Sequence, residues 1–165
     1  MALCGHENGC QCLITAGEGI AITGSGVPGD PWSVSVAPIE WTAFDPTWGN
    51  VTIGDGETSG YYATVPGGIF FYAILNIGST TSASGSGVYF DATSIPDIST
   101  APLFPCVASG RLYIPTNDYP AVASSQAAST RLYAFAKDNN ITGSVPDTWA
   151  DGAFFQISGL YPLNL

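Results

Sequence analysis

The stretch from Gly60 to Thr81 constrains the fold of this chain more than any other part of the sequence. It reads GYYATVPGGIFFYAILNIGSTT and holds the most apolar run of the chain. The dipeptide Pro66-Gly67 favours a type II turn, because proline presets φ at the second turn position and glycine accepts the positive φ needed at the third. We therefore predict a hairpin in which Tyr61–Val65 folds back on Ile69–Ile77.

The second strand of this hairpin is expected to be apolar on both faces. Alternation along a strand places Ile69, Phe71, Ala73, Leu75 and Ile77 on one face and Phe70, Tyr72, Ile74 and Asn76 on the other. An antiparallel sheet usually leaves one face in water, so two apolar faces need two covers. We expect a second sheet over the first face and another copy of the chain over the second. The sequence thus predicts an antiparallel β-sandwich protomer in a homo-oligomer, with an interface at Phe70, Tyr72 and Ile74.

The composition is acidic, sparsely charged and rich in turn residues. Thirteen Asp and Glu against three Lys and Arg give a formal net charge of −10. A nucleic-acid partner needs a basic surface and an anionic membrane repels an acidic one, so both are excluded as partners. Only 10% of the residues are charged, whereas 12% are aromatic and glycine occurs 20 times. This composition indicates an all-β globular protein, because disordered chains are poor in hydrophobic residues.

Nothing in the sequence indicates membrane insertion or catalysis. No basic segment followed by an apolar one opens the chain, and no apolar run reaches about eighteen residues, so we expect synthesis in a host cytoplasm. The only histidine, His6, lies near the N-terminus, where it is poorly placed to serve as the base of a catalytic triad. Cys106 follows an apolar Pro-Leu-Phe-Pro segment, which favours a buried, inert thiol. We predict neither an enzyme nor a cofactor.

Three cysteines and the histidine crowd the N-terminus in the pattern Cys-x-His-x-x-x-Cys-x-Cys. These residues are Cys4, His6, Cys10 and Cys12. Thiolates and imidazole suit a tetrahedral zinc ion, so the four residues form a candidate metal site. Their spacing matches none of the usual ligand pairs. Two other interpretations stay open: a mobile or interface-packed N-terminus, and a stacked oligomer that brings the cysteines together on its axis.

Residues 13–36 predict a small β-structure apart from the main domain. The short alternating segments Gly19–Thr23 and Trp32–Val36 flank a loop of glycine, proline and aspartate. The glycines look like a phosphate-binding loop, but no helical pattern follows them, so we interpret them as turn residues. Ala37–Glu40 is the expected hinge. The predicted domains are therefore an N-terminal β-repeat appendage, residues 1–38, and a sandwich domain, residues 39–165.

Short motifs at both ends of the chain resemble proteins of phages that infect actinobacteria. In residues 17–34, GxGIxIxGxG followed by DPWxV is similar to a short β-repeat near the start of their minor tail and fibre proteins. Residues 41–81, with the opening WTxFxPTW, the GxGxxxGYY and the GSTT after the central strand, resemble the C-terminal globular domain of tail fibres. The closing TWxxG and ISGxY, between residues 145 and 161, resemble the same domain.

The resemblance implies a jelly-roll-like β-sandwich knob that forms a homotrimer on the surface of a virion. The implied function is that of a minor tail or fibre knob that binds host cell-wall carbohydrate, with the N-terminal segment attached to other virion proteins. Because such knobs commonly end much longer chains, a capsid decoration or head-fibre protein is an alternative. A third interpretation is that the chain is a secreted cellular module of the C1q-like or lectin-like kind.

Two similar segments, Gly110–Pro115 and Thr130–Ala136, are predicted strands that carry the two arginines of the chain. In the first strand, alternation places Arg111 and Tyr113 on the same face. In the second strand it places Arg131, Tyr133 and Phe135 on the same face. The side chains that then point toward the core are Leu112, Ile114, Leu132 and Ala134. If the two strands are neighbours, their shared surface offers aromatic faces and guanidinium donors, which suit a sugar ligand. The alternative is that the arginines stack on the tyrosines or bridge to acids of an adjacent subunit.

The aspartates of the sandwich domain are interpreted as turn residues. Those beside Gly, Pro, Ser or Thr are Asp45, Asp55, Asp91, Asp97, Asp147 and Asp151. No Asp-x-Asp-x-Asp-Gly loop occurs, so calcium binding would need ligands that are distant in the sequence.

Overall fold

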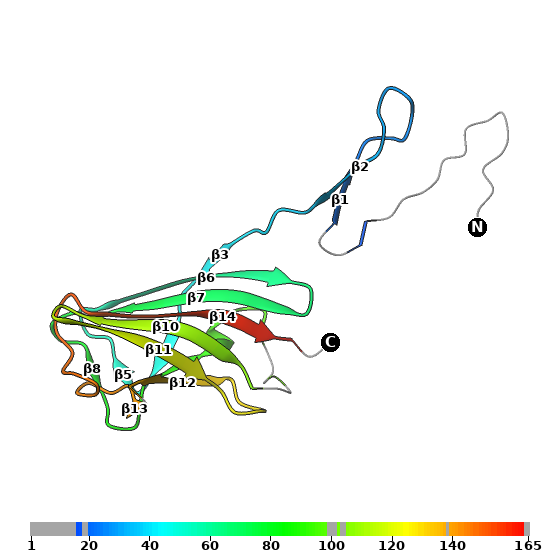
Figure 1. Cartoon of the computed structure of the whole chain (residues 1–165). Helices are drawn as coiled ribbons and strands as arrows, with labels where there is room; N and C mark the ends of the chain where they lie inside the picture. The colour runs from blue at the N-terminus through cyan, green and yellow to red at the C-terminus, as the bar shows by residue number, and fades with distance from the viewer. Residues whose placement is uncertain (1–15, 18–19, 99–101, 103–104, 138, 164–165) are drawn as a thin grey trace. The chain divides into compact units, whose positions relative to one another are not determined.

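A computed structural model describes residues 16–17, 20–98, 102, 105–137 and 139–163 of the chain (Figure 1). In these residues every regular element is a β-strand except one 3-10 turn, η1 (Ala92–Ser94), so the predicted all-β class is confirmed. None of them forms a helix that is long and apolar enough to cross a membrane. The chain divides into two compact units between Ile39 and Glu40, inside the expected hinge.

The first unit contains a two-stranded antiparallel ribbon. Strand β1 (Ile20–Thr23) pairs with β2 (Ser33–Val36), and Ile20 lies opposite Val36. In the loop between them, the backbone amides of Ser25 and Gly26 both donate to the carbonyl of Asp30, at 3.1 and 2.9 Å. The predicted strands and the turn role of the glycines are therefore confirmed in this segment.

The second unit is built around one large antiparallel sheet. Its strands are β3 (Thr42–Phe44), β4 (Thr47–Gly49), β6 (Glu57–Val65), β7 (Gly68–Asn76), β9 (Tyr89–Asp91), β10 (Val107–Ile114), β11 (Asn117–Ser124), β12 (Arg131–Ala136), β13 (Asn139–Asn140) and β14 (Phe154–Pro162). They are ordered β3-β6-β7-β14-β10-β11-β12-β9-β4, and β13 pairs with β12. Two short strands, β5 (Val51–Thr52) and β8 (Ser82–Ala83), form a separate pair.

The two ends of this sheet are consecutive in the sequence. Strand β3 lies at one end of the strand order and β4 at the other, yet only Asp45 and Pro46 separate them. A two-residue link spans no more than about 10 Å, so the sheet must curl until its two ends meet. One sheet therefore supplies both layers of the sandwich, and the layer that covers the apolar face of β7 is the far part of the same sheet.

The predicted hairpin is present as strands β6 and β7. Val65 lies opposite Gly68, which leaves Pro66-Gly67 as a two-residue turn, and Gly67 has the expected positive φ of +84°. On the inner face of β7 the side chains of Ile69, Phe71, Ala73 and Leu75 are at most 2% exposed. The predicted core face of this strand is thus confirmed, and so is the inward direction of Leu112, Ile114, Leu132 and Ala134.

Aromatic rings join the two layers of the curled sheet. The rings of Phe71 on β7 and Phe90 on β9 stack with centroids 5.3 Å apart, and Phe44 on β3 meets Phe90 edge-on at 6.2 Å. Trp48 on β4 contacts Phe155 on β14, with centroids 5.3 Å apart. Because each fully buried ring of this size stabilises the fold by about 1.5–3 kcal/mol, these contacts hold the sheet in its curled form.

Candidate functional site on the outer face of the sheet

The outer face of the large sheet, which points away from the core, carries several exposed apolar side chains. One row across the strands runs Tyr61, Tyr72, Ser158, Ser109, Val122 and Phe135. Beside it lie Phe70 and Leu160, which oppose each other on β7 and β14, and Val107 at the start of β10. The most exposed of these side chains are Tyr61, Phe70, Leu160, Val122 and Val107, at 41–63%.

The predicted interface residues lie on this outer face. Phe70 is 41% exposed, whereas Tyr72 and Ile74 are half-buried among their neighbours. The hydroxyl of Tyr72 donates to Oε1 of Gln156 on β14, at 3.4 Å. The role of these three residues in contacts between copies stays a prediction, and the exposed Tyr61 and Leu160 extend the same apolar surface.

All three basic residues of the chain lie over aromatic rings. The guanidinium carbon of Arg111 is 5.6 Å from the ring centroid of Tyr113 and 5.5 Å from that of Phe154. The guanidinium carbon of Arg131 is 4.9 Å from the ring centroid of Tyr89. Lys137 places its Nζ 4.3 Å from the ring centroid of Tyr119. Cation–π attraction therefore holds each of these charges in place.

Arg111 is engaged by a carboxylate of its own chain. Its Nε and one terminal nitrogen donate to the two oxygens of Asp118 on the adjacent strand β11, both at 2.8 Å. This hydrogen-bonded pair raises the pKa of Arg111 and lowers that of Asp118 from their ordinary values. The charge of Arg111 is thus already balanced, so this side chain is a poor candidate for ligand binding.

Arg131 lies opposite Asp91 on the neighbouring strand β9, and the negative charge of Asp91 acts on it without a direct ion pair. Among the residues that the structure describes, it has no carboxylate within ion-pair distance. A hydrogen bond with Tyr133 is the main cause that raises its pKa. The rings of Tyr89 and Tyr133 lie 5.3 Å apart, and Tyr89 covers Gly49, where a Cβ would overlap its ring. A glycine on β4 therefore lets Tyr89 lie flat beneath the guanidinium.

A surface hollow of about 550 Å³ opens beside Arg131. Its lining consists of Gln126, Ala128, Ser129, Thr130, Arg131 and Tyr133. The hydroxyl of Ser129 accepts from the backbone amide of Arg131 at 3.2 Å, which fixes the start of β12 against the loop before it. This hollow, hereafter the Arg131 hollow, combines an aromatic ring with amide, hydroxyl and guanidinium groups.

The structure does not bring the five predicted ligand-binding residues together. Strand β11 separates β10 from β12, so the two arginine-bearing strands are not neighbours. Arg111 lies opposite Pro120, and Tyr133 lies opposite Ser124, about 13 Å further along β11 at the usual rise per residue. Arg111 and Tyr113 form one cluster, Arg131 and Tyr133 form another, and Phe135 lies opposite Val122 between them.

Sequence reasoning missed the partners that complete each cluster. Phe154 and Asp118 reach Arg111 from β14 and β11, and Tyr89 reaches Arg131 from β9. Gln126 and Ser129 enter from the loop before β12. The sequence carries no local signal for Phe154 and Tyr89, because strand pairing joins them to arginines more than 40 positions away. Asp118 lies only seven positions from Arg111, but strand β11 was not predicted. Gln126 and Ser129 lie within five positions of Arg131, but the loop before β12 was not predicted. The duplicated Arg-Leu-Tyr was the one available signal, and it located only the arginines.

Several predicted turn aspartates hold loops in place. The carboxylate of Asp55 accepts from Ser79 Oγ at 2.6 Å and from the backbone amide and Oγ1 of Thr80 at 2.7 and 2.8 Å. These bonds hold the pKa of Asp55 well below its ordinary value. Asp91 caps η1 by accepting from the amide of Thr93 at 3.1 Å.

The candidate zinc ligands Cys4, His6, Cys10 and Cys12 lie outside the described residues. Within the part of the chain that the structure describes, no group of three His, Cys, Asp or Glu side chains could hold a metal ion. Cys106 is 1% exposed, and its Sγ donates to the carbonyl of Leu160 at 3.3 Å. Burial raises the pKa of this thiol to about 11. The expected burial of Cys106 is confirmed, and its lack of reactivity stays a prediction.

No protein-family model, no curated protein and no solved structure matches the chain. The resemblance to phage tail proteins therefore rests on the sequence motifs, and it stays a prediction.

Proposed function

We propose that this chain is a non-enzymatic structural protein of a phage virion surface, a minor tail or fibre knob that binds host cell-surface carbohydrate. The binding site is the Arg131 hollow. The chain assembles as a homotrimer, and its first unit attaches it to other virion proteins. The sequence motifs support the virion assignment, and the all-β unit with its outward-facing rings supports a role in binding.

The observation that carries the binding proposal is the guanidinium of Arg131 over Tyr89, beside the ring of Tyr133 and without a direct ion pair among the described residues. A sugar ring presents apolar C–H groups to aromatic faces and hydroxyls to polar donors and acceptors. Tyr133 supplies the aromatic face, while Arg131 and Ser129 supply donors on the same hollow.

The charge of the chain limits the class of glycan. A net charge of −10 repels polyanions, so long anionic wall polymers are disfavoured. A neutral glycan, or one with an isolated acidic group that reaches Arg131, meets no such barrier. We infer that the ligand is a neutral or weakly acidic cell-wall polysaccharide.

Exposed apolar side chains of the first unit favour the second candidate function, a capsid decoration or head-fibre protein. Val34 and Val36 are 63% and 79% exposed, and Trp32 is 39% exposed. Exposed apolar side chains of this kind mark contacts with other proteins, as an anchor in a shell lattice would need. Cryo-electron microscopy of the virion distinguishes the two functions, because density at shell sites supports decoration and density at the tail tip supports a knob.

Binding of the purified chain to immobilised host cell-wall fragments tests the carbohydrate proposal. Arg131→Ala should weaken binding at least about tenfold, as expected for loss of a charged hydrogen-bond donor. Arg111→Ala is the matched control, because it removes the other arginine without touching the hollow. Equal binding by both variants and the unmodified chain would exclude the Arg131 hollow as the site.

A further inference from the structure

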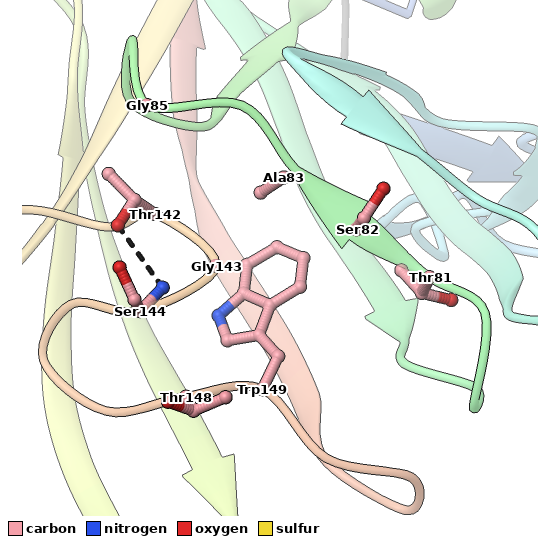
Figure 2. Close-up of a pocket in the computed structure, with 9 residues that line it drawn as sticks. All are labelled: Thr81, Ser82, Ala83, Gly85, Thr142, Gly143, Ser144, Thr148 and Trp149. Carbon is pink, nitrogen blue, oxygen red and sulfur yellow. Dashed lines mark hydrogen bonds between the residues drawn. The ribbon is translucent and has the colours of Figure 1, made fainter.

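A second hollow lies between the β8 segment and the connection that leads into β14 (Figure 2). Its volume is about 370 Å³, within the range of about 300–1,000 Å³ that is common for small-molecule sites. It shares no lining residue with the Arg131 hollow. Figure 2 shows the indole of Trp149 in the middle, with Ser82 and Ala83 on one side and Thr142 and Ser144 on the other.

The lining of this hollow is uncharged but rich in hydroxyl groups. No Asp, Glu, Lys or Arg contributes to it, although the chain carries thirteen acidic residues. Five lining residues carry a hydroxyl: Thr81, Ser82, Thr142, Ser144 and Thr148. The hydroxyl of Thr81 is already used, because it donates to the carbonyl of Ile53 and accepts from the amide of Gly78. That of Thr142 accepts from the amide of Ser144. Such a surface offers both donors and acceptors to a neutral polar ligand and offers no counter-charge to an ion.

Trp149 is held in place by its backbone. Its amide donates to the carbonyl of Gly143 at 3.0 Å, and Thr142 in turn donates to the carbonyl of Val145 at 3.0 Å. The ring is half-buried and packs against the edge of the core. One part of the indole is thus fixed by the protein, and the remainder forms a wall of the hollow.

One polar atom of the Trp149 ring is left without a partner among the described residues. This atom is the buried Nε1, which carries an N–H donor. An unpaired buried donor lowers stability, whereas the packing of the ring on the core edge raises it. A large, electron-rich ring facing a hydroxyl-lined hollow is well suited to stack on the C–H face of a sugar.

We propose that this hollow binds one residue of a neutral sugar. The apolar face of the sugar ring lies against the indole of Trp149, and its hydroxyls bond to the side chains of Ser144 and Thr148. The site is separate from the Arg131 hollow. This proposal rests on the proposed function only because both assume a carbohydrate ligand. The site itself remains intact when Arg131 is replaced.

Titration of the ¹⁵N-labelled chain with methyl glycosides of glucose, galactose and N-acetylglucosamine tests this site. The indole N–H signal of Trp149 is assigned by its loss in Trp149→Phe. At least one glycoside should shift this signal along a saturable curve in the millimolar range. The indole signal of Trp48, which is also buried but lies in the core, should not move.

Two variants separate this proposal from a purely structural role. Trp149→Phe should remain folded and bind the sugar at least about tenfold more weakly, since the smaller ring is a poorer platform. Arg131→Ala should bind these glycosides as the unmodified chain does, even if it has lost cell-wall binding. No saturable shift at any of the three glycosides, or equal affinity of Trp149→Phe, would overturn the proposal.

Discussion

Arg111 and Asp118 form a two-pronged ion pair across the adjacent strands β10 and β11, with both N–O distances at 2.8 Å. The pair is exposed, since the two side chains keep 46% and 52% of their surface accessible. Exposed pairs of this kind contribute little to stability because water and salt screen them. The strands are held instead by their backbone ladder and by the buried side chains on the opposite face.

Arg111→Ala should therefore lower the melting temperature by no more than about 4 °C. The pKa of Asp118 is lowered in the folded chain, so its contribution is present above the ordinary aspartate pKa and is lost as the pH falls below it. Thermal unfolding with and without 1 M salt measures the effect. If the melting temperature of the variant fell by more than about 4 °C, and by the same amount with and without salt, Arg111 would stabilise the fold by packing and not through the ion pair.

Asp55 should make the protein acid-sensitive. Its folded-state pKa lies well below the ordinary value of 3.8, so the stabilisation that it provides is complete at neutral pH and is lost as the pH falls below about 4. Asp55→Asn should destabilise the chain at pH 7. When the urea concentration at the unfolding midpoint is plotted against pH, the acid limb, which is its fall below about pH 4, should be shallower in this variant than in the unmodified chain. Glu57→Gln, at an exposed carboxylate nearby, is the control and should leave that limb unchanged.

Cys106 should make the protein sensitive to alkali. The thiol has a pKa of about 11 when folded against 9.0 when exposed, so it stabilises the fold fully below pH 9 and loses this effect as the pH rises toward 11. The total loss is at most about 3 kcal/mol. Unfolding midpoints between pH 8 and pH 10 should fall in the unmodified chain and fall less in Cys106→Ala. Parallel curves for the two proteins would contradict the assignment.

The neighbouring residues Phe70 and Phe71 should respond in opposite ways to truncation. Phe71 is 2% exposed and stacks on Phe90, so Phe71→Ala should cost about 3–5 kcal/mol in urea unfolding. Phe70 is 41% exposed on the outer face, so Phe70→Ala should cost under about 1 kcal/mol.

Phe70→Ala should instead weaken self-association. The two outer rows of Tyr61, Phe70, Leu160, Val107 and Val122 contain no charged residue, so copies that each carry −10 meet there with the least repulsion. Sedimentation at several concentrations measures the assembly, with Ser158→Ala on the same face as the control. A trimer that survives in Phe70→Ala and in Phe70→Glu would place the interface elsewhere.

The sequence by itself determined the local features of this protein. Proline and glycine at 66 and 67 set the turn of the hairpin, and alternation along β7, β10 and β12 sorted core from surface side chains. These are properties of neighbouring residues, because turn chemistry and the two-residue period of a strand act within a few positions.

Only the tertiary structure decided which surfaces meet. The strand order places β3 and β4 at opposite ends of the sheet, and curling brings those ends together. The same strand order places β11 between the two arginine-bearing strands. As a result Tyr89 of β9 lies under Arg131, and Phe154 of β14 lies beside Arg111. Strand order and register are set by the combined burial of side chains distant in sequence, so no local pattern specifies them.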